Sequence, residues 1–310
     1  MPNAQGQYRC LALHGGGIRG LFTAKILAFI ESQTGKRICD LFDMVCGSST
    51  GAILACGLTK KNPISAEQAV AIYRDRGAQI FSASYWQKFK GLGNTVGPKY
   101  DGTGLRVVLK DTFGDAALED ALVPTFATAF NISDTGPMFF RSWKPGATPT
   151  RLVDVCMASA AGPTYFPPAW VHGKAYVDGG VICNNPALSG LIETCMVNHC
   201  HTREVLVLSV GTGKHDDIID EQKAAGWGNL QWVQPVLDIT TDGVSDLTHY
   251  QLQDLMPDEN YVQMQAALPA DHAAMDDTRL PNLQYLSDAA DRCLASNFDG
   301  LVALLHRLGG

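Results

Sequence analysis

The chain has 310 residues, of which 46% are hydrophobic and 18% charged, a balance typical of globular proteins and unlike that of disordered chains. No run approaches the roughly 18 apolar residues that a membrane-spanning helix needs, and residues 1–7 lack the basic and apolar regions of a signal peptide. The nine cysteines are scattered and form no spaced framework, so we expect reduced thiols in a cytoplasmic protein.

The net charge of −7 is unevenly distributed along the chain. Residues 60–151 contain 12 Lys and Arg against 8 Asp and Glu, whereas residues 211–310 contain 5 against 16. An acidic chain of this kind argues against binding of a nucleic-acid polymer. The basic middle is open to two interpretations: a face toward an anionic surface or ligand, or a solvated surface without a partner.

Hydrophobic periodicity predicts strands and helices that alternate along the chain. In chain order we predict a strand at Arg9–Leu13, a helix at Leu21–Ile30, a strand at Phe42–Cys46, helices at Thr50–Leu58, Ala66–Gly77 and Leu105–Phe113, strands at Thr125–Ile132 and Met138–Trp143, a helix at Val153–Ala161, a strand at Ala175–Val177, a helix at Ala187–Asn198, a strand at Val205–Val210, and a helical segment at Leu283–Leu308. Gly35, which follows the first predicted helix, is interpreted as its C-terminal stop. Residues 214–262 have no clear period and are interpreted as a long excursion or a cap. The alternation is typical of an α/β fold with a central sheet between helices.

Glycines follow the first predicted strand in the segment His14-Gly15-Gly16-Gly17-Ile18-Arg19-Gly20. Bare backbone N–H groups in such a turn, next to a helix N-terminus, are suited to holding an anion or a developing oxyanion. The spacing of Gly15, Gly17 and Gly20 also matches a dinucleotide-binding fingerprint, with Asp40 about 20 residues further on, although a single match of this kind is weak. A tight turn without a ligand is the third interpretation.

The pentad Gly47-Ser48-Ser49-Thr50-Gly51 lies between a predicted strand and a predicted helix. This is the context of the Gly-x-Ser-x-Gly nucleophile elbow, in which small residues allow a sharp turn that exposes the serine hydroxyl at a helix N-terminus. Such pentads also arise by chance in turns rich in glycine and serine. The strand–turn–helix context favours Ser49 as a nucleophile.

A candidate acid and two candidate bases accompany the serine. Asp178 ends a short predicted strand before Gly179 and Gly180, which puts a carboxylate at the rim of a sheet or, alternatively, in an ordinary turn. A Ser hydrolase commonly uses a histidine, and His14 and His172 lie nearest to the motifs. A metal site is disfavoured at a further cluster, formed by Cys195, His199, Cys200 and His201. This cluster lacks a second pair of ligands at zinc-like spacing.

Taken together, these segments resemble the patatin-like phospholipase family. In chain order the matching segments are the glycine loop Gly15–Gly20, the elbow Gly47–Gly51, the stretch Ala158–Pro168 ahead of the acid, the block Asp178-Gly179-Gly180 with Asn184-Asn185-Pro186, and the strand and turn Leu208–Gly213. The ordered set is specific, although each piece alone is weak to moderate. Ala52 stands where many members have Gly, and Gly162 where many have Ala; neither change removes a catalytic group.

The resemblance implies a fold and a domain organisation. The fold is a three-layer α/β structure with a central, mostly parallel sheet between helices. We expect a single domain over residues 1–310, with the catalytic core at about residues 8–213 and a variable cap with C-terminal helices at residues 214–310.

The resemblance also implies a chemistry, namely ester hydrolysis of membrane glycerophospholipids. Ser49 and Asp178 form a catalytic dyad in this family, so neither His14 nor His172 is expected to act as a base. The oxyanion hole is implied for the glycine loop, with Gly15, Gly16, Gly17 and Arg19. Because that loop holds the developing charge, no cofactor and no calcium are expected.

A narrower resemblance is to the phospholipase effectors of cyclic-oligonucleotide antiphage systems, which are short cytosolic bacterial members of the family. It rests on chain length, the predicted helix Leu21–Ile30 after the glycine loop, and the stretch from Tyr100 to Asp115, which is also common in other relatives. The implied partners are membrane phospholipid as substrate, a cyclic di- or trinucleotide as activator, and a second copy of the chain in a homo-oligomer. The alternatives are a housekeeping lipid acyl hydrolase without a switch and, more distantly, a non-catalytic binding protein or a dinucleotide-dependent oxidoreductase.

Two groups of side chains suit a regulated enzyme that acts at the inner membrane surface. Aromatic residues beside lysines suit a lipid interface, although a core or dimer contact explains them equally well. The first such cluster comprises Phe81, Tyr85, Trp86 and Phe89 with Lys88 and Lys90, and the second Trp227, Leu230 and Trp232. Basic residues that could meet the phosphates of a nucleotide are Lys60, Lys61, Arg74, Arg76, Lys88 and Lys90.

Overall fold

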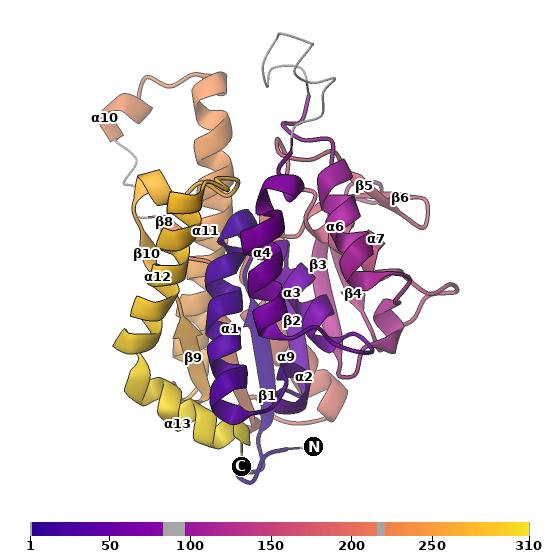
Figure 1. Cartoon of the computed structure of the whole chain (residues 1–310), viewed down its shortest axis with the longest axis vertical. Helices are drawn as coiled ribbons and strands as arrows, with labels where there is room; N and C mark the ends of the chain where they lie inside the picture. The colour runs from indigo at the N-terminus through magenta and orange to yellow at the C-terminus, as the bar shows by residue number, and fades with distance from the viewer. Residues whose placement is uncertain (1, 83–96, 216–220, 310) are drawn as a thin grey trace.

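The computed structural model describes residues 2–82, 97–215 and 221–309, and its centre is an eight-stranded sheet (Figure 1). The strand order is β5 (Ala169–Val171), β6 (Lys174–Asp178), β3 (Thr125–Asn131), β2 (Met44–Ser48), β1 (Tyr8–Leu13), β7 (Val205–Val210) and β9 (Tyr261–Met264), while β4 (Gly136–Arg141) pairs with β3. All pairings from β3 through β2, β1 and β7 to β9 are parallel, whereas β4, β5 and β6 pair antiparallel. The chain enters β1 beside the termini at the bottom of Figure 1, so the carboxyl ends of the parallel strands point away from the termini.

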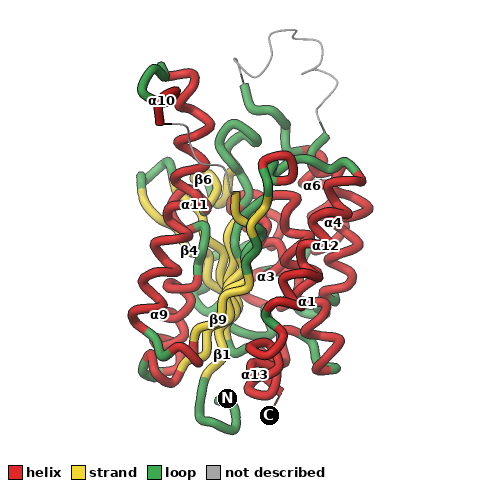
Figure 2. Tube along the Cα trace, turned by 90° about the vertical axis from the view of Figure 1, so that its left-hand side faces the viewer, coloured by secondary structure: helices red, strands yellow, loops and turns green. Residues whose placement is uncertain are grey.

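Helices cover both faces of this sheet, which gives three layers (Figure 2). One layer contains α1 (Gly20–Thr34), α3 (Thr50–Thr59), α4 (Ala66–Ile80), α6 (Thr103–Phe113), α12 (Leu280–Ser296) and α13 (Phe298–Gly309). The opposite layer contains α9 (Ala187–Asn198) and α11 (Asn229–Leu255). The remaining helices and strands are α2 (Ile38–Leu41), α7 (Leu152–Ser159), α8 (Gly180–Cys183), α10 (Glu221–Ala224), and the small pair β8 (Lys214–His215) and β10 (Ala267–Leu268).

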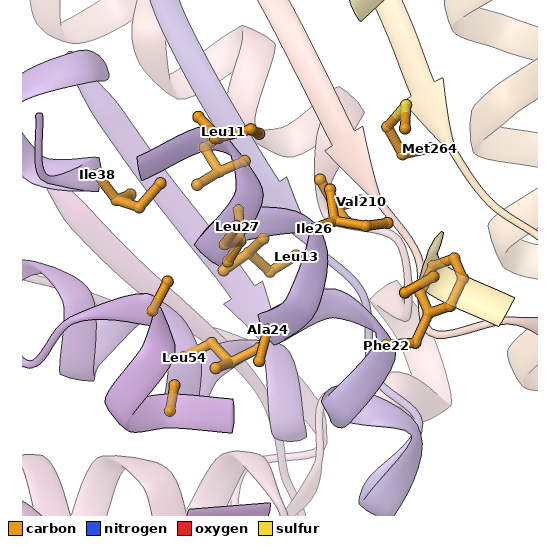
Figure 3. Packing of buried hydrophobic residues seen from close by; sticks show 14 of the residues in the cluster. Leu11, Leu13, Phe22, Ala24, Ile26, Leu27, Ile38, Leu54, Val210 and Met264 are labelled. Carbon is orange, nitrogen blue, oxygen red and sulfur yellow. The ribbon is translucent and has the colours of Figure 1, made fainter. Parts of the chain in front are cut away.

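The alternation of side chains along β1 explains why both faces need helices. Leu11 and Leu13 point into a core formed with α1, whereas Cys10 and Ala12 belong to the core under α9 and α11. Figure 3 shows Leu11 and Leu13 beside side chains of α1, including Leu27. Burial of one such leucine contributes roughly 1.5–3 kcal/mol, so a strand that is apolar on both faces is stable only between two helical layers.

The predicted fold class, a central sheet between helices, is confirmed. Each predicted strand and helix from Arg9 to Val210 has a counterpart, with ends that differ by a few residues. The predicted end of the first helix at Gly35 is also confirmed, because Gly35 adopts the left-handed conformation (φ 64°, ψ 11°) that glycine tolerates.

The C-terminal third differs from the prediction in several places, among them the central-sheet strand β9, which has no predicted counterpart. Residues 214–262 include the 27-residue helix α11, which the sequence pattern does not reveal because Pro235 interrupts it and exposed apolar residues such as Val236 and Ile239 blur its polar face. The single helical segment predicted at Leu283–Leu308 is two helices, α12 and α13, separated at Asn297.

Candidate active site

Ser49 occupies a sharp turn between β2 and α3. Its backbone dihedral angles are φ 52° and ψ −121°, a strained combination for a residue with a side chain. The flanking positions must be glycine: a Cβ on Gly47 would lie 2.1 Å from the carbonyl oxygen of Gly51, and a Cβ on Gly51 would lie 2.1 Å from that of Leu13. The turn therefore presents Ser49 at the N-terminus of α3, where the helix dipole stabilises negative charge.

Asp178 reaches Ser49 because β6 runs antiparallel along β3. Residues 125–128 of β3 pair with β2, which ends at Ser48 opposite Thr128. The next residues of β3 pair with β6, which ends at Asp178 opposite Ala129. The two strands therefore approach head on, and the residues at their carboxyl ends meet.

The side chains of Ser49 and Asp178 are in direct contact. The Ser49 hydroxyl donates a hydrogen bond of 2.7 Å to Oδ2 of Asp178. The backbone N–H of Gly180 donates to Oδ1 at 2.7 Å, which fixes the carboxylate, and the amide of Ser49 donates to Oγ of Ser159 at 3.0 Å. The arrangement can transfer a proton from the serine to the carboxylate without an intervening histidine.

Burial tunes the carboxyl group of Asp178. Desolvation raises its pKa from 3.8 to about 6, against the opposing effect of the hydrogen bonds from Ser49 and Gly180. A carboxylate with this pKa is ionised at neutral pH and is a stronger base than a solvated aspartate. An ordinary carboxylate is a poor base for a serine hydroxyl, and the raised pKa makes Asp178 a stronger one.

The glycine loop lies next to Ser49 and is fixed from two sides. The amide of Gly15 donates to the carbonyl of Asn184 at 3.1 Å, and the amide of Ile18 donates to the carbonyl of Met275 at 2.8 Å. Between them, the amides of Gly16 and Gly17 donate to no acceptor in the described part of the chain. Both glycines line the same pocket as Ser49 and Asp178, so their N–H groups are available to an oxyanion.

Arg19 lies behind the loop rather than in this pocket. Its side chain is 5% exposed and donates from Nε to the carbonyl of Gly16 at 3.4 Å. It lines a second, polar pocket together with His14 and Asp242. Desolvation lowers the pKa of Arg19, while the nearby Asp242 opposes that shift. Arg19 therefore contacts the loop backbone and not the Ser49–Asp178 pair.

The two candidate histidines are not beside the serine. His14 is buried and its Nε2 lies 2.7 Å from Oγ of Ser209. Burial lowers the pKa of His14 to about 3, so its imidazole is neutral. His172 lies in the turn before β6, at the opposite end of that strand from Asp178, and contacts Thr150.

The other sequence candidates are distributed over the surface. Asp40 lies on α2, before the start of β2, where it accepts a hydrogen bond from the amide of Arg37. The dinucleotide interpretation needed this carboxylate near the glycine loop, at the other end of the sheet. His199 is the C-terminal cap of α9, and the described residues contain no group of three or more His, Cys, Asp or Glu that could hold a metal ion.

The basic residues that could bind a nucleotide are partly paired. Arg74 forms an ion pair with Asp75, and Arg76 with Asp111. The residues that lie outside the described part of the chain are Tyr85, Trp86, Lys88, Phe89 and Lys90. In the second aromatic cluster, the rings of Trp227 and Trp232 meet edge to face at 5.0 Å.

A largely apolar pocket with about 850 Å³ of empty space, part of it open to solvent, contains the Ser49–Asp178 pair. Its apolar walls come from α3, α4, α6, α11 and the segment after α7, with Ile53, Ile80, Phe81, Leu105, Pro163, Tyr165, Phe166 and Leu237. Such walls suit a long apolar substrate with one reactive polar group. None of the helices in residues 2–82, 97–215 and 221–309 is both long and apolar enough to cross a bilayer.

Sequence reasoning assigned no role to four residues that hold the site together. Ser159 and Asn184 lie inside the segments that carry the family resemblance, so their positions were a usable signal. Thr212, whose hydroxyl donates to the carbonyl of Gly15 at 2.8 Å, lies in the last matching segment. Met275 has no such signal, because it contributes only a backbone carbonyl.

Comparison of the sequence with known proteins identifies one family. A family model described as patatin-like phospholipase matches residues 11–191. The chain is 30% identical to patatin-1-Kuras 2 of Solanum tuberosum over 327 aligned positions, covering 92% of this chain and 85% of the relative, and 31% identical to patatin-03 of the same plant, covering 92% and 83%. Among solved structures, VipD from Legionella pneumophila has a TM-score of 0.45 at 14% identity and covers 95% of this chain and 68% of its own. The family match spans the glycine loop, the elbow and the acid.

The raised pKa of Asp178 predicts a pH-dependent cost in stability. Between the unfolded pKa near 4 and the folded pKa of about 6, the folded state binds more protons than the unfolded state, so the free energy of unfolding falls as pH rises through this window. A shift of this size corresponds to about 3 kcal/mol. We expect Asp178→Asn to remove this loss, so that the variant unfolds at higher temperature or denaturant concentration than the wild type at pH 8 and the difference shrinks below pH 4.

The matched control is Asp134→Asn. Lys174 lowers the pKa of the exposed Asp134, so neutralising it brings no gain in stability at pH 8. A lower unfolding midpoint for Asp178→Asn than for the wild type at pH 8 contradicts the assignment of Asp178 as a destabilised carboxylate.

Proposed function

Because the chain belongs to the patatin-like phospholipase family, we propose that it hydrolyses acyl esters of membrane glycerophospholipids, with Ser49 as nucleophile and Asp178 as its base. The observation that carries this proposal is the 2.7 Å hydrogen bond from the Ser49 hydroxyl to Asp178, at a strained turn beside two available backbone amides. The description of the family as patatin-like phospholipases fits this pair of groups.

The first half of the reaction acylates the enzyme. Ser49 Oγ attacks the carbonyl carbon of the ester while its proton passes to Oδ2 of Asp178. The carbonyl oxygen becomes an oxyanion that accepts hydrogen bonds from the amides of Gly16 and Gly17. The intermediate collapses, Asp178 returns the proton to the leaving oxygen, and a lysophospholipid departs from the acyl-Ser49 ester.

The second half releases the fatty acid. Water enters, loses a proton to Asp178 and attacks the acyl carbon. The same two amides hold the second oxyanion, and the proton on Asp178 passes to Oγ of Ser49 as the carbon–oxygen bond breaks. Each oxyanion donor contributes about 2.7–4 kcal/mol to catalysis in comparable enzymes. The hydrogen bonds to Asn184 and Met275 keep the loop rigid, so the same two amides stay in place for the oxyanion.

Contact with a membrane is supported by the N-terminal half of α11. Leu237 and Thr241 of this helix line the pocket, whereas Val236 and Ile239 beside them are each 48% exposed. The exposed pair continues toward Trp232, an amphipathic aromatic side chain of the kind found at bilayer surfaces. We assign this half of α11 to contact with the bilayer, where a phospholipid can enter the pocket.

Substitution of the dyad tests the proposal directly. We expect Ser49→Ala and Asp178→Asn each to lower the hydrolysis of phosphatidylcholine vesicles at least about a thousandfold, because each removes a group that participates in the transition state. Fatty acid release from vesicles measures the rate, and thermal unfolding verifies the fold. The control Ser32→Ala changes an exposed serine on α1 whose hydroxyl donates to the carbonyl of Phe29 at 2.8 Å. Near-normal turnover by either dyad variant contradicts the mechanism.

Removal of divalent cations is a second test. We expect the same vesicle assay to give an unchanged rate in excess chelator, because backbone amides of the glycine loop hold the oxyanion without a metal ion. A rate that falls in chelator and recovers on addition of calcium refutes this part of the proposal.

Activation by a cyclic nucleotide remains the finer prediction. A phospholipase in the cytoplasm endangers its own membrane, so we expect low basal activity and a rise of up to about a hundredfold with one ligand of a cyclic di- and trinucleotide panel. A full switch from about 1% to 99% active requires roughly 5.5 kcal/mol of differential binding, part of which assembly into a homo-oligomer can supply. Equal hydrolysis with every ligand and with none leaves an unregulated housekeeping lipid acyl hydrolase as the function.

A further inference from the structure

A second apolar cavity adjoins the pocket that contains Ser49. It has about 400 Å³ of empty space, part of it open to solvent, between α3, α4 and α6. The two cavities share the side chains of Ile53, Tyr73, Ile80 and Leu105, which belong to both walls at once. We call these four residues the neck, and the space beyond them the chamber.

The chamber offers nothing that a polar group could bind. Its remaining walls are Leu54, Ile64, Ala69, Ile72, Val108, Leu109 and Thr112. The two hydroxyls on its boundary are already used: Tyr73 bonds Thr50, and Thr112 donates to the carbonyl of Val108 at 2.7 Å. A lipid headgroup would lose its hydrogen bonds to water here without replacement, whereas a hydrocarbon chain would not.

The position of the neck connects the chamber with the reacting atoms. Ile53 lies one helical turn after Ser49 on α3, which is roughly 6 Å along the axis. Tyr73 is held at the neck by its hydrogen bonds to Thr50, the residue that follows Ser49. An acyl group attached to Ser49 Oγ therefore finds apolar side chains along α3, in the direction of the chamber.

We propose that the chamber takes the distal part of the substrate's acyl chain and that its far wall limits the chain length that the enzyme prefers. This inference rests on the proposed function, because it concerns the acyl group that Ser49 receives. Each methylene that leaves water for the chamber raises kcat/KM about fourfold, the equivalent of about 0.8 kcal/mol, until the far wall is reached.

The experiment narrows the chamber from its walls on α4 and α6 and measures chain-length preference. Val108→Phe extends a buried residue of α6 into the chamber, and Ile72→Phe does so from a half-buried position of α4 that tolerates a larger side chain more easily. The control is Val107→Phe, the same change at the neighbouring position of α6, which is 39% exposed and lines neither cavity. The substrates are p-nitrophenyl butyrate, octanoate, laurate and palmitate.

The expected result is a fall in the ratio of kcat/KM for laurate to that for butyrate by about tenfold or more in Val108→Phe and Ile72→Phe, corresponding to the loss of about two methylenes from the chamber. Val107→Phe keeps the wild-type ratio. A wild-type ratio in both chamber variants, or an equal fall in Val107→Phe, overturns the proposal.

Binding of a fluorescent polyene fatty acid separates this inference from the proposed function. If the wild-type protein hydrolyses no ester but binds the fatty acid, and both chamber variants bind it at least tenfold more weakly than Val107→Phe, the chamber is supported and the hydrolase assignment fails. If the wild type hydrolyses esters with no preference between butyrate and laurate, the hydrolase assignment stands and the chamber is refuted.

Discussion

The shared edge of β3 is the constraint on which the site depends. Along this edge β2 runs parallel over residues 125–128 and β6 runs antiparallel over residues 129–131, so neither strand can lengthen without colliding with the other. Ser49 and Asp178, which are 129 positions apart in the chain, meet because each begins the turn forced by that collision. The sheet therefore fixes the distance between the hydroxyl and the carboxylate before any side-chain interaction acts.

This junction is crowded and poorly solvated. The hydroxyls of Ser48 and Thr128, which are opposite each other in the register of β2 and β3, are buried without a hydrogen-bond partner in the described structure. An unsatisfied buried hydroxyl costs roughly 1–3 kcal/mol, in addition to the strained backbone of Ser49 and the buried charge of Asp178. The apolar cores on both faces of the sheet offset these costs, which explains why the strained residues lie between rigid layers.

The sequence was sufficient to predict features that depend on the local pattern of residues. It was insufficient for features that depend on contacts between remote parts of the chain. The apolar run Val205–Val210 predicted a strand, because a continuous apolar run of this length is typical of a strand buried on both faces. Gly35 predicted the end of a helix, because glycine tolerates the left-handed conformation of a helix cap. The elbow at Ser49 and the acid at Asp178 could be proposed from motifs and family resemblance. Their contact could not be derived from spacing, because it arises from strand pairings remote in the chain. α11 was missed because tertiary packing, and not periodicity, stabilises a helix that contains Pro235.

The glycine loop is anchored by parts of the chain that come much later. The backbone carbonyl of Met275 accepts a hydrogen bond from the amide of Ile18. The backbone carbonyl of Asn184 accepts one from the amide of Gly15, and the side-chain amide of Asn184 in turn donates to the hydroxyl of Ser245 on α11. Met275 and Ser245 both lie beyond residue 191, where the match to the family model ends. The residues matched by the family model are therefore not the whole of the unit that holds the site together. When relatives diverge in their last third, they can alter how firmly the glycine loop is held while every residue of the recognisable motifs stays the same.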